Sequence, residues 1–208
     1  ADVGAASHDP DATQAAIRDI GSVAAEMERI VDALMALTRY EAGLESPQPE
    51  PINLAAELRR EVRRQAVAAE QRGLTIVLDL PVEAWVHTDS ALAHRLLANL
   101  LGNAVSHSPH GATVSVAMSG NGDLSFANPA PHLSPADLPR LGERFYRIDT
   151  GEKATHAGLG LSLADAIARI LGLTLRLQKR EDGCLVAEVR GFQALEPGTA
   201  SRNVSEPG

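Results

Sequence analysis

The sequence predicts a mixed α/β domain with several antiparallel strand pairs, preceded by a long amphipathic helix. Apolar residues recur every three or four positions over residues 13–40, which is a helical period. Between residues 54 and 192, helix-like and strand-like runs alternate, and Ser119-Gly120-Asn121-Gly122 joins two strand-like runs with a strong hairpin signal. At 208 residues, 44% of them apolar, the chain is long enough for one ordinary domain plus an appendage.

The first expected element is a helix over about residues 13–41. Its apolar positions form a coiled-coil-like seam: Ile17, Ile20, Val23, Met27, Ile30, Leu34 and Leu37. No neighbouring segment obviously covers this seam, which favours a partner helix from a second chain or from outside this sequence; folding back onto its own domain is the alternative. Ala42-Gly43 ends the helix, and the proline-rich residues 45–53 are expected to form a stiff, extended linker.

The remaining elements follow in order from residue 54. We expect helices at 54–72, from 90 onward, near 135–141 and at 160–171, and strands at 74–80, 85–87, 113–118, 123–127, 173–179 and 185–190. Asp89 stands where it could cap the second helix. This domain is expected to span residues 54–192, and the tail at 193–208, rich in Pro, Gly, Ser and Glu, is expected to be disordered.

Composition excludes several classes of function. A net charge of −8 and only 3% aromatic residues argue against nucleic acid as a partner, because such partners need a basic surface and stacking side chains. Cys184 is the single cysteine, so a disulfide framework within the chain and a multi-cysteine zinc site are excluded, and a buried strand thiol is expected. No apolar run approaches the ~20 residues that cross a bilayer.

Asn99 and Asn103 are the first candidate site residues. Their i, i+4 spacing places both carboxamides on one helix face, while Leu96, Leu97, Leu100 and Leu101 cover the opposite face. Carboxamide oxygens suit Mg²⁺ that is already partly neutralised by anionic phosphates. The pair therefore indicates one wall of a nucleotide pocket.

The turn at Ala157-Gly158-Leu159-Gly160-Leu161 indicates the second wall. Glycines permit close approach of the backbone to a phosphate, and the helix that follows presents free N–H groups and a positive dipole end. The preceding polar segment, residues 147–157, has the composition of a lid that orders over phosphates.

These motifs match a known family. Asn99-Leu-Leu-Gly-Asn103-Ala, Glu143-Arg-Phe-Tyr-Arg147 and Gly158-Leu-Gly-Leu161-Ser occur in the order of the N box, F box and second glycine box, and the chain resembles bacterial sensor histidine kinases over about residues 13–192. The resemblance implies a Bergerat ATPase domain of the GHKL superfamily: a two-layer α/β sandwich with a mixed sheet, preceded by a dimerisation helix, that binds ATP and Mg²⁺.

The resemblance also implies roles for individual residues. Asn103 would be the Mg²⁺ ligand, and Asn99 would lie toward the phosphates. His107 would contact the nucleotide, or it is a histidine at a helix C-terminus that favours the dipole. The remaining ATP-binding candidates are Asn128, Arg144, Arg147, Lys153, Gly158, Leu159, Gly160 and Leu161. For Arg144 and Arg147, a solvent-facing charge is the alternative, and Phe145 is expected to anchor the lid.

The sequence departs from the family at the first glycine box. Asn128-Pro129-Ala130-Pro131-His132 aligns with the usual Asp-x-Gly-x-Gly and lacks its aspartate and both glycines. Asn128 can still accept a hydrogen bond from the adenine amine, although more weakly than a carboxylate, and the prolines are expected to stiffen this loop. Ser106 and His156 are smaller departures, and we expect weak ATP binding.

The phosphate-accepting histidine is expected to lie upstream of residue 1. His8 precedes Pro10 and stands too close to the first helix to begin a complete helical hairpin, so residues 1–44 are read as the second hairpin helix and its loop. The implied function is transfer of the ATP γ-phosphoryl group to that histidine, for relay to a response-regulator aspartate. The full-length protein is expected to be a homodimer in the bacterial inner membrane, with this domain on the cytoplasmic side. A pseudokinase or nucleotide-binding scaffold and another GHKL ATPase are the alternatives.

Overall fold

The computed structural model describes residues 42–119, 121–143, 146 and 159–195, together with Gln14, Gly21, Met35 and residues 38–40. Its elements follow the order β1 (Pro49–Asn53), α2 (Leu54–Gln71), β2 (Thr75–Asp79), β3 (Trp85–Asp89), α3 (Ser90–His107), β4 (Thr113–Met118), β5 (Leu124–Pro129), η1 (Leu138–Arg140), α4 (Gly160–Ile170), β6 (Thr174–Lys179), β7 (Cys184–Arg190) and β8 (Gln193–Ala194).

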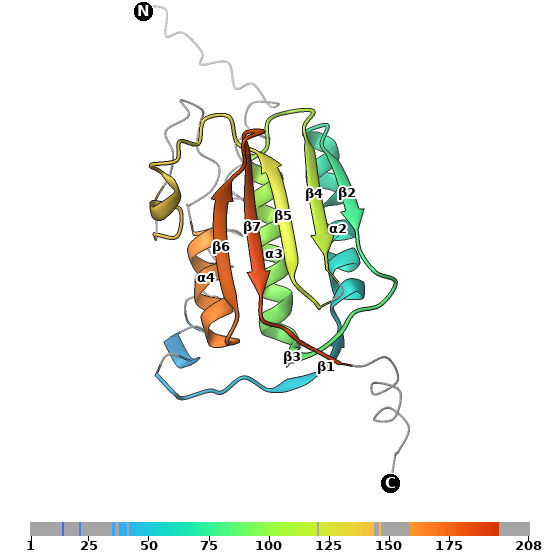
Figure 1. The fold of residues 1–208 in the computed structure, drawn as a ribbon, viewed down its shortest axis with the longest axis vertical. Helices are drawn as coiled ribbons and strands as arrows, with labels where there is room; N and C mark the ends of the chain where they lie inside the picture. Colours follow the sequence, from blue (N-terminus) through green and yellow to red (C-terminus); the bar gives the residue numbers. More distant parts are fainter. Residues whose placement is uncertain are drawn as a thin grey trace, which may run out of the picture.

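The elements form two layers. The larger sheet has the strand order β2-β4-β5-β7-β6, in which β2 and β4 are parallel and the other neighbours antiparallel. Helices α2, α3 and α4 cover one face of this sheet, with α3 in the middle (Figure 1). A smaller sheet, β1-β3-β8, lies beneath one end of the layers. The predicted mixed α/β sandwich with a mixed sheet is confirmed.

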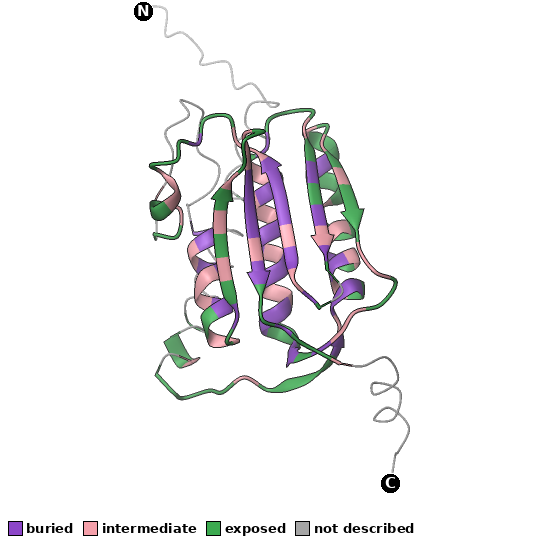
Figure 2. Cartoon of the chain, in the orientation of Figure 1, coloured by how far each residue is buried: buried purple, intermediate pink, exposed green. Residues whose placement is uncertain are grey.

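The core lies between the sheet and the helices. Phe126 of β5 is almost completely buried, as are Leu96, Leu97, Leu100 and Leu101 of α3. Because side chains alternate along a strand, Leu124, Phe126 and Asn128 share the face of β5 that points toward the helices. Figure 2 shows the buried positions concentrated in α3 and in the central strands.

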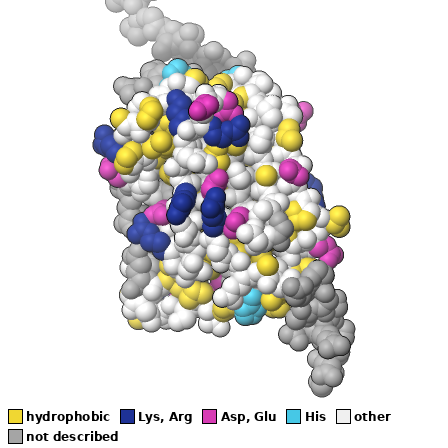
Figure 3. All heavy atoms as spheres, in the orientation of Figure 1, with side chains coloured by type: hydrophobic (Ala, Val, Ile, Leu, Met, Phe, Trp, Pro, Cys, Tyr) yellow, Lys and Arg dark blue, Asp and Glu magenta, His cyan; other side chains and the backbone are white. Residues whose placement is uncertain are grey.

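The outer face of the sheet is polar. Arg176 is exposed, and its register partner Glu188 accepts hydrogen bonds from Gln178, at 3.1 Å, and from Arg190, at 2.8 Å. Basic and acidic side chains lie side by side on this face (Figure 3). A sheet with one face on the core and one polar face is typical of antiparallel strands.

Side chains at the two predicted N-termini cap the helices. Asp89 Oδ1 accepts a hydrogen bond from the Leu92 backbone N–H at 2.9 Å, which confirms Asp89 as the N-cap of α3. Asn53 caps α2 by accepting from the Ala56 N–H at 3.2 Å. Both helices therefore begin where a short polar side chain can replace the missing intrahelical acceptor.

The structure differs from the sequence-based expectations at three segments. The expected linker contains β1, whose residues pair with β3 from Pro49↔Asp89 to Asn53↔Trp85. The expected tail begins with β8, which also pairs with β3. Strand β5 continues through Asn128 and Pro129, so the altered glycine box begins inside a strand rather than in a loop. Proline lacks a backbone N–H and is tolerated only in edge strands and at strand ends. Strand β1 is an edge strand, and Pro129 is the last residue of β5.

Only part of the first expected helix lies within the described residues. Gln14, Gly21, Met35 and residues 38–40 are helical, and Tyr40 packs against the core of the domain, whereas Met35 is 62% exposed. The rest of residues 1–37 lies outside the described residues.

Cys184 lies in β7 as expected but is only half-buried. Burial is the main cause that raises the pKa of its thiol, and the hydrogen bond with Asp182 is the second.

Candidate functional site

The two asparagines of α3 lie one turn apart on the same side of the helix. Asn99 is buried, at 4% exposed, and its Nδ2 donates to the Arg95 carbonyl at 2.7 Å. Asn103 is half-buried and its carboxamide makes no recorded hydrogen bond within the described residues. Of the two, Asn103 is therefore the side chain whose oxygen is available to a ligand.

The start of α4 lies against these asparagines. A Cβ placed on Gly160 would stand 3.7 Å from Asn103 Oδ1, 3.8 Å from Asn103 Cβ and 3.8 Å from the Asn99 carbonyl oxygen. These are ordinary contact distances, so an alanine would fit, but a longer side chain would extend into the space beside the Asn103 carboxamide. The glycine thus keeps that oxygen accessible, and the structure brings together two motifs that are distant in the sequence.

Backbone donors stand at the N-terminus of α4. Its N-cap residue is Leu159, and no side chain of the described residues caps the helix. The Leu163 N–H donates to the Leu159 carbonyl at 2.9 Å, so the first intrahelical bond begins there and the N–H groups of residues 160–162 precede it. Leu159 and Leu161 are themselves buried, at 6% and 7% exposed, and so anchor this turn through apolar contacts.

Asn128 occupies the helix-facing side of β5. It is 3% exposed and pairs with Leu185 of β7. Its Nδ2 donates to the Pro129 carbonyl at 3.2 Å. The end of β5, the C-terminal end of α3 and the start of α4 lie toward the same end of the domain (Figure 1). The substituted aspartate position therefore shares this end with Asn103 and Gly160.

His107 lies at the C-terminal end of α3 and is exposed. A histidine here can interact with the helix dipole and can also reach a ligand at this end of the domain, so both interpretations from the sequence remain. The neighbouring Ser108 ends the helix, with its Oγ donating to the Ala104 carbonyl at 2.7 Å. Ser106 is half-buried on the preceding turn.

A carboxylate that the sequence analysis missed organises the segment before the expected lid. Asp137 accepts hydrogen bonds from the Ser134 N–H at 2.8 Å, the Ser134 hydroxyl at 2.6 Å and the Tyr146 hydroxyl at 2.7 Å. The Ser134 and Tyr146 hydrogen bonds lower the pKa of Asp137, and Asp137 raises the pKa of Tyr146. The spacing Ser-x-x-Asp, typical of a chain turn fixed by side chains, was the available sequence signal.

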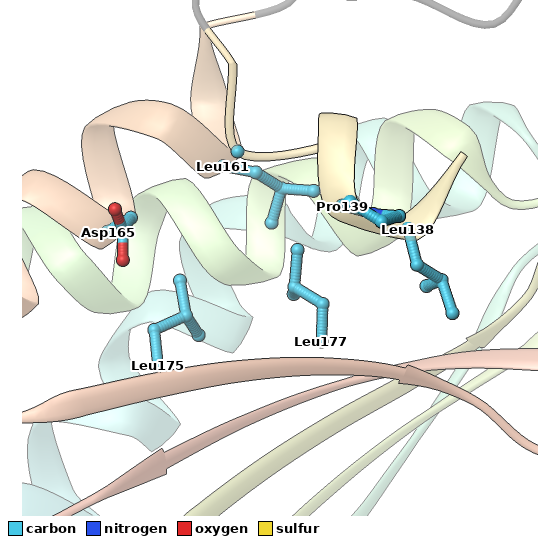
Figure 4. Close-up of a pocket in the computed structure, with 7 residues that line it drawn as sticks. Leu138, Pro139, Leu161, Asp165, Leu175 and Leu177 are labelled. Carbon is cyan, nitrogen blue, oxygen red and sulfur yellow. The ribbon is translucent and has the colours of Figure 1, made fainter. Parts of the chain in front are cut away.

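A cavity of about 380 Å³ borders the site. Leu138 and Pro139 of η1 lie on one side, Leu161 and Asp165 of α4 on another, and Leu175 and Leu177 of β6 form its floor (Figure 4). Leu161 joins this cavity to the turn at Gly160. Among the described residues that line the cavity, Asp165 is the only one with a polar side chain.

Several candidate residues lie outside the described part of the chain. These are Arg144, Phe145, Arg147, Lys153, His156 and Gly158. Among the described residues, no group of three or more His, Cys, Asp or Glu side chains could hold a metal ion.

Comparison with known proteins identifies relatives of this arrangement. The family model for histidine kinase-, DNA gyrase B-, and HSP90-like ATPases matches residues 88–193, about half of the chain. The sensor protein QseC of Escherichia coli O157:H7 is 34% identical over 182 residues, which are 87% of this chain and 40% of QseC. The sensor-like histidine kinase SenX3 of Mycolicibacterium smegmatis is 29% identical over 166 residues, 77% of this chain and 42% of SenX3.

Solved structures agree on the fold. Full-length ShkA in complex with AMPPNP has a TM-score of 0.71 at 20% identity, covering 89% of this chain and 39% of ShkA. The cytoplasmic segment of the histidine kinase QseC has a TM-score of 0.57 at 24% identity, covering 79% of this chain and 91% of that segment.

The chain spans about 40% of the length of these sequence relatives. In the part of the chain that the structure describes, every helix is too short or too polar to span a bilayer.

Proposed function

Since this chain belongs to the histidine kinase-, DNA gyrase B-, and HSP90-like ATPase family, as the ATP-binding catalytic core of a sensor histidine kinase, we propose that it transfers the γ-phosphoryl group of ATP to a protein histidine. ATP with Mg²⁺ binds between α3 and the segment that precedes α4. The observation that carries this proposal is the approach of Gly160 to the Asn103 carboxamide, which joins a neutral oxygen ligand to the N–H groups of a helix N-terminus.

The donor set fits Mg²⁺ carried by a polyphosphate. Asn103 Oδ1 is a hard, uncharged ligand with no competing hydrogen bond among the described residues, and the space beside it is kept open by Gly160. When bound, the ion would neutralise charge on the phosphates and polarise the group that is transferred. Full-length ShkA, which shares this fold, was solved in complex with AMPPNP, and this supports nucleotide binding by a domain of this kind.

The protein's own contribution is positioning and electrostatic stabilisation. Asn103 would hold the ion, and Asn99 would lie toward the phosphates. The backbone N–H groups of residues 160–162, at the start of α4, would bind phosphate oxygens. Asn128 receives the nucleobase, and Leu161 supports the turn from the apolar side. His107, Arg144, Arg147, Lys153 and Gly158 complete the proposed ATP-binding set.

The acceptor, the partners and the location are proposed for the longer protein of which this domain is the catalytic part. The acceptor histidine belongs to a partner helix of a homodimeric hairpin, to which the helix over residues 13–41 contributes its apolar seam. A response-regulator aspartate then receives the phosphoryl group. The QseC structure is described as a cytoplasmic segment, which supports a position on the cytoplasmic side of the bacterial membrane.

Isothermal titration of the chain with AMPPNP and Mg²⁺ tests the nucleotide site. We expect Asn103→Ala to weaken binding at least tenfold, about 1.4 kcal/mol, because the ion loses its protein ligand. Asn121→Ala, which changes an exposed carboxamide in the β4–β5 hairpin, is the matched control and is expected to bind like the native chain. Absence of binding by the native chain would contradict the proposal.

Transfer is tested separately with a second chain that carries an acceptor helix of a sensor kinase. Radioactive phosphate on the acceptor histidine is the expected result in the presence of ATP and Mg²⁺. Binding of nucleotide without transfer to any such helix would favour the nucleotide-responsive scaffold, an alternative supported by the loss of the aspartate and glycines at residues 128–132.

A further inference from the structure

Strand β2 forms one edge of the larger sheet. Among the described residues it pairs with β4 alone, and Figure 1 shows it as the outermost strand on that side. The Thr75 N–H donates to the Ala112 carbonyl at 3.0 Å, so the backbone groups of Thr75 point toward β4. Successive residues of a strand in a parallel ladder point their backbone groups to opposite sides. The N–H and C=O groups of Ile76 and Leu78 therefore face the open side of β2.

Exposed apolar side chains gather around this edge. Val77 is 48% exposed, Leu78 is 38% exposed, and Val82, just after the strand, is 86% exposed. Val67, on the helix α2 that packs against β2, is 65% exposed. These four are the majority of the large apolar side chains that are exposed within the described part of the chain.

The two edges of the sheet differ in their protection. An edge strand can pair with another chain unless charged side chains, prolines or bulges prevent it. The opposite edge strand, β6, carries the cations Arg176 and Lys179. Strand β2 has no proline and no basic residue, its single charge is Asp79 at its end, and its register with β4 runs without a bulge. Strand β2 is therefore the edge that is open to pairing.

The residues of β2 match a second copy of the same strand. If two copies run antiparallel about a two-fold axis at Val77, Ile76 faces Leu78 and Thr75 faces Asp79. Apolar side chains then meet apolar ones, a hydroxyl meets a carboxylate, and no like charges oppose each other. The same register joins the open backbone groups of Ile76 to those of Leu78. Moving the axis to Leu78 would instead set Val77 against Asp79.

We propose that β2 pairs antiparallel with β2 of a second copy of this chain about a two-fold axis at Val77, so that two larger sheets become one continuous sheet. A contact through one strand of five residues is at the small, transient end of protein interfaces, so the association is weak and increases with concentration. This inference goes beyond the proposed function, because it uses neither the nucleotide site nor the helix seam over residues 13–41.

Disulfide trapping tests the register on the full 208-residue chain, with Cys184→Ser removing the native thiol. Val77→Cys places two thiols at the axis, where the Cα atoms of a non-hydrogen-bonded pair lie ~4.5 Å apart, within reach of a disulfide. Ser115→Cys is the matched control, because Ser115 is the exposed register partner of Val77 and lies one strand further from the axis. With oxidised glutathione, we expect at least about fivefold more covalent dimer from Val77→Cys than from Ser115→Cys.

Hydrogen exchange tests the pairing without a new thiol. Exchange of the Ile76 and Leu78 N–H groups, followed by mass spectrometry of a peptide over residues 74–80, should slow at least about threefold as the concentration of the native chain rises, because a bonded N–H exchanges only when the pairing opens. Val77→Lys should abolish this dependence, since it sets two like charges opposite each other, whereas Ser115→Lys should retain it.

Two results would overturn the proposal. One is an equal yield of covalent dimer from Val77→Cys and Ser115→Cys, or no dimer from either, as expected if copies meet only through the helix seam. The other is exchange of Ile76 and Leu78 that does not depend on concentration. Both results leave the proposed function intact, because nucleotide titration reports on a different site. Conversely, a chain that does not bind AMPPNP would contradict that function and leave the pairing of β2 standing.

Discussion

At the scale of single residues, a few hydrogen bonds decide how polar side chains are used. Asn103 has no competing partner among the described residues, Asn128 Nδ2 donates to the Pro129 carbonyl, and Asp137 accepts from Ser134 and Tyr146. The sequence identified the two asparagines by their motifs. For Asp137 it offered only the local Ser-x-x-Asp spacing, since the hydroxyl of Tyr146 comes from nine residues further along the chain.

The Asp137–Tyr146 bond leads to a prediction about titration. The bond needs an ionised Asp137 and a protonated Tyr146. Its contribution is therefore present at neutral pH; it is lost as the pH falls through the pKa of Asp137, which lies below its ordinary value of 3.8, and as it rises through the pKa of Tyr146, which lies above 10.0. The phenolate absorbance of the two tyrosines measures the loss at high pH, because it follows the ionisation of Tyr146.

Asp137→Asn should lower the pKa of one tyrosine toward its ordinary value and leave the other raised. The other tyrosine is Tyr40, whose pKa is raised first by burial and then by the charge of Asp89. Asp182→Asn, which changes a carboxylate held by the Cys184 N–H and Arg180, serves as the control and should leave both tyrosines unchanged. An unaltered titration curve for Asp137→Asn would show that the bond does not persist in solution.

At the scale of elements, α3 connects the two ends of the domain. Asp89 begins the helix by accepting from the Leu92 N–H, and its second oxygen accepts from the Gln48 N–H at 2.9 Å. Asn103 and His107 lie at the opposite end of the same 18-residue helix. One buried carboxylate therefore fixes both the start of α3 and the segment that leads to β1.

Asp89→Ala should lower the free energy of unfolding by about 1 to 2 kcal/mol, because the α3 cap is lost and the Gln48 donor loses its acceptor. Denaturation with urea, followed by circular dichroism, measures this change. Asp79→Ala, at an exposed carboxylate of β2, is the matched control and is expected to change stability by less than about 0.5 kcal/mol. Equal stability of the two variants would refute the role of Asp89.

At the scale of the whole molecule, the chain closes on itself through the smaller sheet. Strand β3 pairs with β1 on one side and with β8 on the other, and Phe192, just before β8, is 7% exposed. The C-terminal strand therefore belongs to the folded domain, although its composition resembled that of a tail. The Leu195 N–H extends this pairing by donating to the Trp85 carbonyl at 2.8 Å.

Truncation tests this closure. A chain that ends at Gly191 loses Phe192 and β8 and should be destabilised by about 3 kcal/mol or more relative to a chain that ends at Leu195, mainly because an aromatic side chain leaves the core. Thermal unfolding of the two truncated chains gives the comparison, and the 208-residue chain is the reference. Indistinguishable midpoints would mean that β8 contributes nothing to the stability of the domain.

Much of the architecture could be predicted from local patterns. The helices α2, α3 and α4 and the strands of the larger sheet lie close to the expected ranges, and the Asp89 cap is confirmed. These features depend on residues within one or two turns or along one strand, so their signals are contained in short stretches of sequence. The family and the ATPase fold followed from three motifs in order, and the comparisons confirm both.

The sequence by itself thus determined the helices, the strands of the larger sheet and the placement of Asn99 and Asn103 on one side of a helix. Only the tertiary structure decided that Gly160 lies against Asn103, that Asn128 is buried in β5 with its Nδ2 on the Pro129 carbonyl, and that β1, β3 and β8 form one small sheet. The physical reason is range: helix periods and caps are set by neighbours in the chain, whereas strand pairing and the approach of two helices depend on contacts between residues far apart in sequence.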